Sequence, residues 1–286
     1  MMTNGTSYKT LLIFPPVWTP VTPYLAFPIL VAYLRNKGLS TKQYDASLDF
    51  FTRYLLDPDT LLGIWERVNN RRKSNDYSNA PEETKGLLRD LETNESQWLE
   101  RISRVTSTLD LLRQEHHFFH PGTCIRAQSD LYHLLNLASL AYYPLSFTFN
   151  TFHAPDIHDF STLLQFLDDP ERNPFLTFYF NMVARKLERE HPCLVGISVS
   201  TSHQLIGALS LARFVKKRMP SVHVAFGGRH IPRLQEALKS NPVFFSRFCD
   251  SLVLDNGERP LHALIDCLRD GRDPNIVPNL VHFSKD

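Results

Sequence analysis

The stretch CLVGISVSTSHQLIGALSLARFVKKRMPSVHVAFGGRHI, residues 193–231, decides the fold of this chain. It predicts a buried strand over Leu194–Val199, a polar turn, a long amphipathic helix, and a second buried strand that ends in Gly227-Gly228. Apolar strands that alternate with helices are typical of a parallel sheet covered by helices. Ligands of such sheets bind in the crevice outside the carboxyl ends of the strands.

The first 47 residues add a strand, a helix and a second strand to this pattern. Pro15-Pro16 end the first strand, a helix is predicted from about residue 24 to residue 36, and Gly38 stops it. The second strand ends at Asp45. We expect one apolar stripe of the helix to consist of Leu25, Ile29, Ala32 and Tyr33.

The residues after 231 continue the alternation. We predict a helix over 234–239, a strand over 251–254 and a helix over 260–269. The turn between the last two should have positive φ at Asn256 or Gly257. A short apolar piece near the end of the chain is expected to pair at a sheet edge, which gives a sheet of four or five parallel strands.

Residues 48–190 have helical rather than strand periodicity. The predicted fold class is therefore α/β: a Rossmann-like, flavodoxin-like parallel sheet with flanking helices and a large helical insertion. We assign residues 1–47 and 191–286 to the Rossmann-like domain and residues 48–190 to the insertion.

Composition excludes several classes of partner. A formal net charge of +1 gives no overall field for nucleic acid, and no apolar run approaches the length of a membrane helix. The N-terminus lacks the apolar core of a signal peptide. The four cysteines are scattered, which is typical of reduced thiols, so we expect a cytoplasmic protein.

Familiar nucleotide and metal motifs are missing. The first strand is followed by neither GxGxxG nor a Walker sequence, which disfavours dinucleotides and nucleoside triphosphates bound through those motifs. His116, His117 and His120 have local spacing compatible with a metal, but no carboxylate or cysteine accompanies them, so we predict no metal site.

Polar residues and glycines gather where the predicted strands end. Some of the hydroxyls of Ser198, Ser200, Thr201 and Ser202 should cap the helix that follows, and at least one should contact a ligand. Trp18 is either a packing residue or a platform for a ligand face. No catalytic residue is predicted. The candidate binding residues are Trp18, Thr19, Ser198, Ser200, Thr201, Ser202, Gln204, Gly227, Gly228, Arg229, His230, Asn256, Gly257 and Glu258.

These segments resemble a known family. They are similar to the cobalamin-binding domain that precedes the catalytic barrel in B12-dependent radical SAM enzymes, and closest to the branch that acts in ribosomal-peptide maturation. The residues that carry the resemblance are Gly196-Ile197-Ser198, Gln204, Gly227-Gly228, His230, Asp250, Gly257-Glu258 and Pro260-Leu261.

The resemblance implies a cobalamin cofactor, with the glycines clearing space for its nucleotide tail. Two departures qualify it. Asp255 replaces the first glycine of the usual GEGE turn, and the chain has no CxxxCxxC, so no iron–sulfur cluster site is present in this sequence. A radical SAM protein or a C-terminal domain would then be the partner. Since D-x-H-x-x-G is also missing, cobalt would lack a histidine ligand, with Trp18 or a neighbour beneath it.

We therefore expect a cobalamin-binding component of a B12-dependent radical SAM methyltransferase, which presents the corrinoid for methyl transfer in peptide natural-product maturation. Two alternatives stay open. One is a non-catalytic corrinoid or small-molecule sensor that acts through a protein partner, and the other is an enzyme with a different nucleotide-type ligand in the same crevice.

Overall fold

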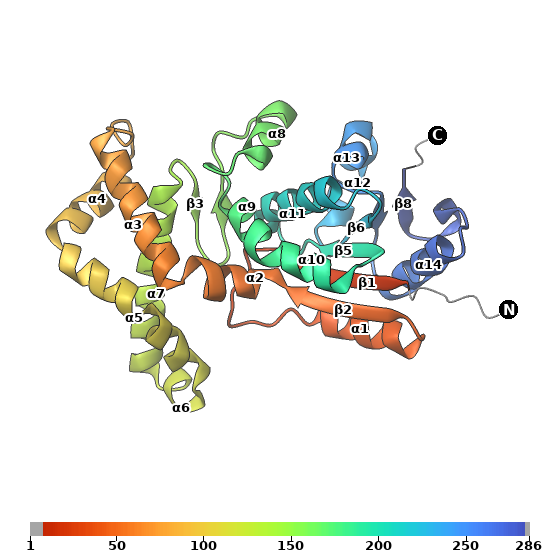
Figure 1. Ribbon diagram of the computed structural model, residues 1–286, viewed down its shortest axis with the longest axis horizontal. Coiled ribbons are helices and arrows are strands. Elements are labelled where there is room, and N and C mark those ends of the chain that lie inside the picture. Colours follow the sequence, from red (N-terminus) through yellow and green to blue (C-terminus); the bar gives the residue numbers. More distant parts are fainter. Residues whose placement is uncertain (1–7, 284–286) are drawn as a thin grey trace. The chain divides into compact units, whose positions relative to one another are not determined.

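The chain folds into two compact units (Figure 1). The structure, a computed structural model, describes residues 8–283 of the 286. Residues 1–47 and 164–286 form the first unit, named the sheet unit, and residues 48–163 form the second, named the helical unit.

A six-stranded sheet organises the sheet unit. Its order is β2-β1-β5-β6-β7-β8, with all neighbours parallel except β7 and β8. The five parallel strands have the doubly wound order of flavodoxin-like folds, so the predicted α/β, Rossmann-like class is confirmed. The antiparallel strand is the apolar piece expected at the edge. The strands are β1 (Lys9–Phe14), β2 (Ser40–Asp45), β5 (Leu194–Ser198), β6 (His223–Gly227), β7 (Ser251–Val253) and β8 (Leu280–His282).

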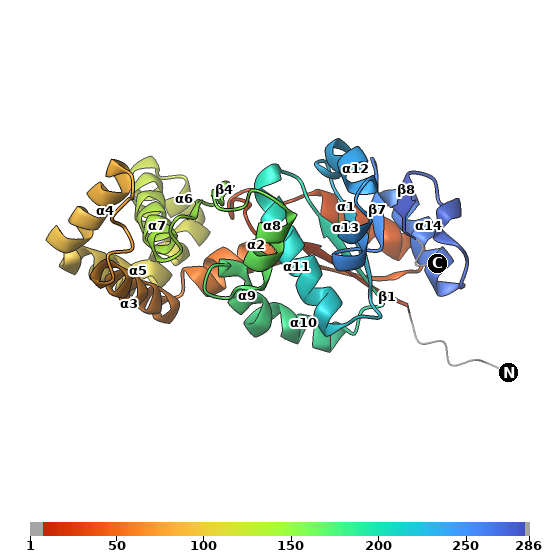
Figure 2. The same ribbon diagram turned by 90° about the horizontal axis from the view of Figure 1, so that it is seen from above.

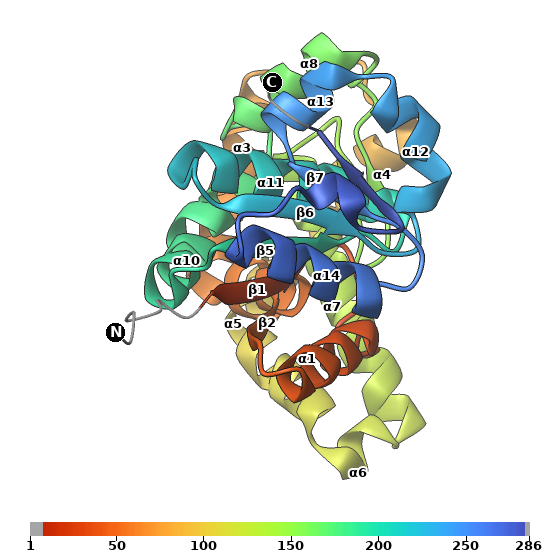
Figure 3. The same ribbon diagram turned by 90° about the vertical axis from the view of Figure 1, so that its right-hand side faces the viewer.

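Helices cover both faces of the sheet. Figure 3 shows α1 (Ala26–Asn36) beside α14 (Glu258–Arg269) on one face, with α10 (Ala184–Glu190) and α11 (Leu205–Arg218) on the other. Two short helices, α12 (Ile231–Lys239) and α13 (Pro242–Arg247), connect β6 to β7, and η3 (Ser202–Gln204) precedes α11. A single turn, η4 (Pro274–Ile276), precedes β8.

The segment 164–190 belongs to the sheet unit, although the sequence assigns it to the insertion. It contains α9 (Pro174–Phe178), η2 (Tyr179–Val183) and α10. The Tyr179 hydroxyl donates to the Gly207 carbonyl at 2.8 Å, and the Asn173 amide donates to the Ser210 hydroxyl at 2.9 Å. Helical periodicity reveals that a helix has a buried face, but not which neighbour covers that face.

The apolar stripe predicted for α1 is on the wrong side of the helix. Phe27, Val31 and Leu34 are the buried residues, whereas Leu25 is 65% exposed and Ile29 is 56% exposed. Residues 10–34 contain no charged side chain, so no polar face distinguishes the two sides of this helix in the sequence.

The helical unit is a bundle of helices. Figure 2 shows α3, α5 and α7 packed side by side, with α4 at their end. A two-stranded antiparallel sheet, β3 (Ser146–Phe147) with β4 (Phe152–His153), follows the bundle and was not predicted. The helices are η1 (Phe50–Leu55), α3 (Pro58–Lys73), α4 (Glu82–Thr93), α5 (Glu95–Arg113), α6 (Glu115–Phe118) and α7 (Pro121–Ala141); α2 (Ala46–Asp49) and α8 (Phe160–Asp168) lie at its borders.

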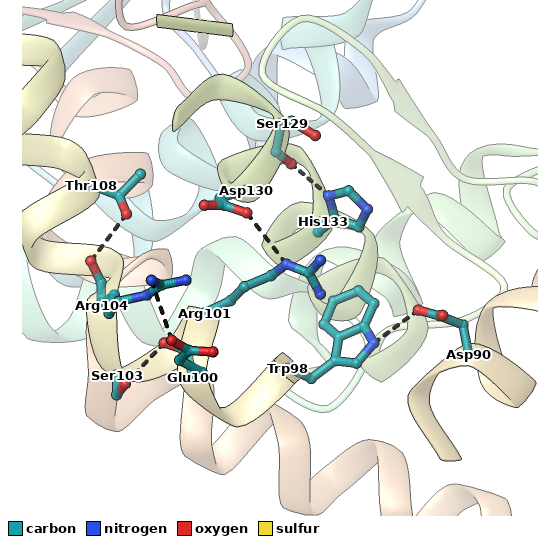
Figure 4. A network of polar contacts seen from close by, with 10 residues as sticks. All are labelled: Asp90, Trp98, Glu100, Arg101, Ser103, Arg104, Thr108, Ser129, Asp130 and His133. Carbon is teal, nitrogen blue, oxygen red and sulfur yellow. Dashed lines mark hydrogen bonds and ion pairs between the residues drawn. The ribbon is translucent and has the colours of Figure 1, made fainter. Parts of the chain in front are cut away.

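A polar network fixes the bundle around the buried Trp98 (Figure 4). The indole N–H of Trp98 donates to Asp90 at 2.9 Å, which ties α5 to α4. Arg101 lies over the Trp98 ring and donates to Asp130 of α7 at 3.3 Å. Each charged group of this network has a partner within the bundle, so the network is structural.

Candidate functional site

A cavity of about 630 Å³ opens at the carboxyl ends of β5, β6 and β7. The register of the sheet sets Ser198 of β5 level with Gly227 of β6, so both strands end at this opening. The cavity reaches α1, α12 and α14, all within the sheet unit. Its place is the crevice that open α/β sheets use for ligands.

The inner walls of the cavity are apolar. They are formed by side chains that also belong to the core beneath α1 and α14, namely Leu12, Phe27, Ala225, Val253 and Leu261. Leu30 of α1 packs against Gly257, where an added Cβ would be 3.4 Å from the leucine side chain, so this contact closes the cavity on one side. We name the apolar inner part of the cavity, between α1 and the end of β7, the apolar slot. Its lining suits an apolar ring.

Two hydroxyl groups share a hydrogen bond in the cavity wall. The Ser198 and Tyr24 hydroxyl oxygens are 2.7 Å apart, and Ser198 is 7% exposed. Two hydroxyls bring two protons, and a single bond between them uses only one. Within residues 8–283 neither hydroxyl has another partner, so one O–H is free to donate to a ligand.

The mouth of the cavity carries charges of both signs. Arg229 and Arg233 line the α12 side, and Asp255 and Glu258 line the α14 side. Among the described residues, none of the four has an ion-pair partner, although all four line one cavity. Asn256 lies at the same rim and is exposed.

The turn before α14 differs from the prediction in one backbone angle. Positive φ falls on Asp255, at 55°, and not on Asn256 or Gly257. Gly257 has φ −74° and serves as the N-cap, so that α14 begins at Glu258. Asp255 occupies the left-handed conformation that the first glycine of the GEGE turn would adopt without cost, and aspartate is one of the few side chains that tolerate it.

The two glycines at the end of β6, Gly227 and Gly228, have different roles. A Cβ on Gly228 would lie 2.6 Å from the Val199 carbonyl oxygen, and its φ of 97° strains any side chain. A Cβ on Gly227 would meet Val253 at an ordinary 3.7 Å. Both line the cavity, but Gly228 makes room for the backbone of the loop after β5 rather than for a ligand.

The loop after β5 is held by Gln204 and not by its hydroxyls. Gln204 is fully buried; its amide oxygen accepts from the Ser200 backbone N–H at 2.9 Å, and its amide nitrogen donates to the Pro15 carbonyl at 3.0 Å. No side chain caps η3 or α11, so the predicted capping role of the serines is wrong. The glutamine satisfies the loop backbone instead.

Of the four hydroxyl residues in this region, only Ser198 lines the cavity. Ser200 is buried, Ser202 is exposed, and the Thr201 hydroxyl is buried without a hydrogen-bond partner among the described residues. Thus Ser200, Thr201, Ser202 and Gln204 lie behind the cavity rather than in its wall.

Trp18 packs in an aromatic cluster. Its ring meets Phe14 and Tyr24 edge-on, with centroids 5.7 Å and 6.1 Å away, and its indole N–H donates to the Thr22 carbonyl at 2.7 Å. These are packing contacts, and the role of Trp18 as a platform for a ligand stays a prediction. The Thr19 carbonyl accepts from the Thr22 N–H and closes the same turn, and neither residue lines the cavity.

His230 lies next to the cavity without lining it. Its backbone N–H donates to the Val199 carbonyl at 3.0 Å, so the residue helps to join the loops after β5 and β6. Desolvation lowers the pKa of the His230 imidazole, and the neighbouring Arg233 lowers it further. The predicted residues that the cavity does bring together are Ser198, Gly227, Gly228, Arg229, Asn256, Gly257 and Glu258.

Several lining residues were not predicted. Leu30 comes from α1, which the sequence treats as a core helix, and Tyr24 lies just before that helix. Arg233 lies in α12, one helical turn beyond Arg229. The lack of any charge over residues 10–34 is a signal that would have drawn attention to α1.

The described residues hold neither a metal-binding cluster nor a membrane-spanning helix. Over residues 8–283, no group of three or more His, Cys, Asp or Glu side chains is placed to bind a metal ion. Within the same range, no helix has the length and apolar character to cross a bilayer. In the sequence comparisons and the structure comparison, the chain matches no protein-family model, no curated protein and no solved structure.

Proposed function

We propose that the sheet unit binds cobalamin, with the nucleotide tail of the corrinoid in the cavity and the macrocycle outside its mouth. The observation that carries the proposal is the apolar slot that ends in a spare hydroxyl donor, at the carboxyl edge of a doubly wound sheet. A benzimidazole ring is flat and apolar and bears a ring nitrogen that accepts a hydrogen bond, so it complements both features.

The size of the cavity supports a tail rather than a whole corrinoid. Its volume of about 630 Å³ lies within the usual range for drug-sized ligands, about 300–1,000 Å³. A corrin macrocycle with its amide side chains is wider than such a cavity. The ring would therefore rest at the edge of the sheet, near the loops after β1 and β5, and the tail would anchor it.

The residues of this chain would bind and orient the cofactor without a catalytic group of their own. Among the described residues, neither histidine nor cysteine lines the cavity. The methyl-transfer chemistry would belong to the bound corrinoid and to a radical SAM protein or domain. Peptide natural-product maturation is the proposed setting.

An uncharged apolar surface next to the cavity supports a protein partner. Val21, Leu25 and Ile29 are 51%, 65% and 56% exposed, and Ile29 also lines the cavity. Exposed apolar side chains that gather beside a ligand site are typical of a protein interface. We expect Leu25→Asp to weaken the binding of a radical SAM partner protein, while the affinity for the corrinoid stays unchanged.

The binding proposal is tested by titration of hydroxocobalamin, followed by its absorption spectrum. Leu30→Trp fills the apolar slot and should weaken the binding of hydroxocobalamin at least about tenfold, because the indole occupies the space proposed for the benzimidazole ring. Ala32→Trp is the matched control, since Ala32 is exposed on the same helix and does not line the cavity. Equal affinity of the wild type and Leu30→Trp, or no binding by the wild type, would refute the proposal.

A smaller nucleotide-type ligand is the second candidate, and the cavity volume favours it because a nucleotide would fit entirely inside. This candidate would be supported if the protein binds a nucleotide tightly and does not bind cobalamin.

A further inference from the structure

The four unpaired charges at the cavity mouth are separated by sign. Arg229 and Arg233 stand one helical turn apart at the start of α12, and α12 has no acidic residue in its first turn. Asp255 and Glu258 line the same cavity from the segment where α14 begins. Within the described part of the chain, no arginine at this mouth approaches a carboxylate oxygen within 4.0 Å.

Several other acidic and basic groups of the sheet unit form ion pairs. Arg213 and Lys217 both bind Asp168, and Lys216 binds Asp250 at 2.7 Å. The opposite charges in these pairs are in contact, whereas the four charges of the mouth line one cavity without forming an ion pair. Two guanidinium groups in one wall raise the local positive potential, which attracts an anionic group, while two carboxylates accept hydrogen bonds from donors.

We propose that Arg229 and Arg233 form a subsite for a phosphate group of the ligand, and that Asp255 and Glu258 accept hydrogen bonds from its hydroxyl or amide groups. The ligand then enters in one orientation, with its phosphate toward α12. This inference rests on the proposed function, because it assigns the polar end of the tail whose ring lies in the apolar slot. It also defines the ligand class, a ribonucleotide rather than a bare heterocycle.

The probe is the benzimidazole ribonucleoside with and without its phosphate, titrated into the full chain by calorimetry. The wild type should bind the phosphorylated form at least about tenfold more tightly, since a charge-assisted hydrogen bond is worth about one decade of affinity. Arg229→Gln and Arg233→Gln should each reduce this preference, and the double variant should abolish it. The affinity for the unphosphorylated form should not change.

Two controls make the result specific. Arg247→Gln removes an exposed arginine outside the cavity and should leave the preference intact. Glu258→Gln should weaken both forms by a similar factor, because it acts on the sugar and not on the phosphate. The subsite is overturned if the preference survives in the double variant, or if the wild type binds both forms equally or binds neither.

Failure of this inference is distinguishable from failure of the proposed function. If the phosphorylated nucleoside binds as expected but hydroxocobalamin does not, the corrinoid proposal fails and the phosphate subsite stands. If hydroxocobalamin binds and the double variant binds it as tightly as the wild type does, the subsite fails and the corrinoid proposal stands.

Discussion

The amino ends of β6 and β7 differ from the carboxyl ends of the same strands in how their polar groups are partnered. At the amino end, Asp250 binds Lys216 through both carboxylate oxygens and also accepts from the Val224 backbone N–H at 2.8 Å. The Ser251 hydroxyl bridges the imidazoles of His223 and His282, at 2.9 Å and 3.1 Å. At the carboxyl end, the cavity keeps a spare O–H and four charged side chains without ion-pair partners among residues 8–283.

This difference separates structure from function within one sheet. Buried polar groups in a stable core find partners, because an unsatisfied group costs the free energy of its desolvation. Groups left without partners in a concave site are available to a ligand. The amino end therefore stabilises the fold, and the carboxyl end is the place where binding is to be sought.

The largest expected effect is at the amino end. Asp250→Ala should lower the free energy of unfolding by about 3–5 kcal/mol, because it leaves the largely buried Lys216 ammonium uncompensated. Glu236→Ala is the control: its ion pair with Lys239 is exposed and should contribute less than about 1 kcal/mol. Urea unfolding measures both. Equal losses in the two variants would show that the Asp250–Lys216 pair stabilises the fold no more than an exposed pair does.

A pH dependence follows from His223. Burial lowers the pKa of its imidazole to about 4, with His282 and Lys216 adding to the effect and Asp250 opposing it. Since the unfolded histidine titrates near about 6.5, the unfolded state binds the proton first as the pH falls. About 3 kcal/mol of stability should then be lost between about pH 6.5 and pH 4.

The His223→Gln variant tests this linkage, because glutamine retains a polar partner for Ser251 but does not titrate. Urea unfolding at a series of pH values should give a shallower slope for the variant over the same window. Parallel curves for wild type and variant would show that another group causes the loss.

The two glycines at the end of β6 should give a smaller, paired effect. Gly228→Ala should cost at least about 2 kcal/mol, because the new Cβ meets the Val199 carbonyl and φ is 97°. Gly227→Ala should cost less than about 1 kcal/mol, since the nearest atom is 3.7 Å away. Chemical unfolding of both variants decides it, and similar losses would contradict the assigned roles.

The smallest effect on stability is expected inside the cavity. Ser198→Ala should change the free energy of unfolding by no more than about 1 kcal/mol, yet weaken cobalamin binding about fivefold to tenfold by removing half of the hydroxyl pair. Ser202→Ala, an exposed neighbour outside the cavity, should change neither quantity. An unchanged affinity in Ser198→Ala would exclude the hydroxyl pair from ligand binding.

Much of the fold was predictable because its strands are short apolar runs between clear breaks. The strands around Leu194 and Val224 and the helix between them follow the predicted order, and Gly38 ends α1 in a left-handed conformation with φ 78°. The side of α1 that faces the core was not predictable, because apolar residues lie on both of its sides. The segment 164–190 was misassigned for a related reason, since its periodicity does not identify its neighbour.

The candidate site was predicted in its location and only partly in its members. Because ligands bind at the carboxyl ends of strands, the sequence predicts Ser198, Gly227 and Glu258 at the site, and all three line the cavity. Gln204 lies in the loop after β5 but bonds the loop backbone, and Trp18 lies in the loop after β1 but packs in an aromatic cluster. Only the side-chain positions distinguish these roles from ligand binding. Tyr24 was missed because it lies far from Ser198 in the sequence, 174 residues away.

The central claim, that the cavity holds the nucleotide tail of a corrinoid, is tested most directly by comparing cobalamin with cobinamide, which lacks the tail. Both are titrated into the wild type and into Leu30→Trp. The wild type should bind cobalamin at least about tenfold more tightly than cobinamide, and Leu30→Trp should bind the two equally. Equal binding of cobalamin and cobinamide by the wild type would contradict the claim.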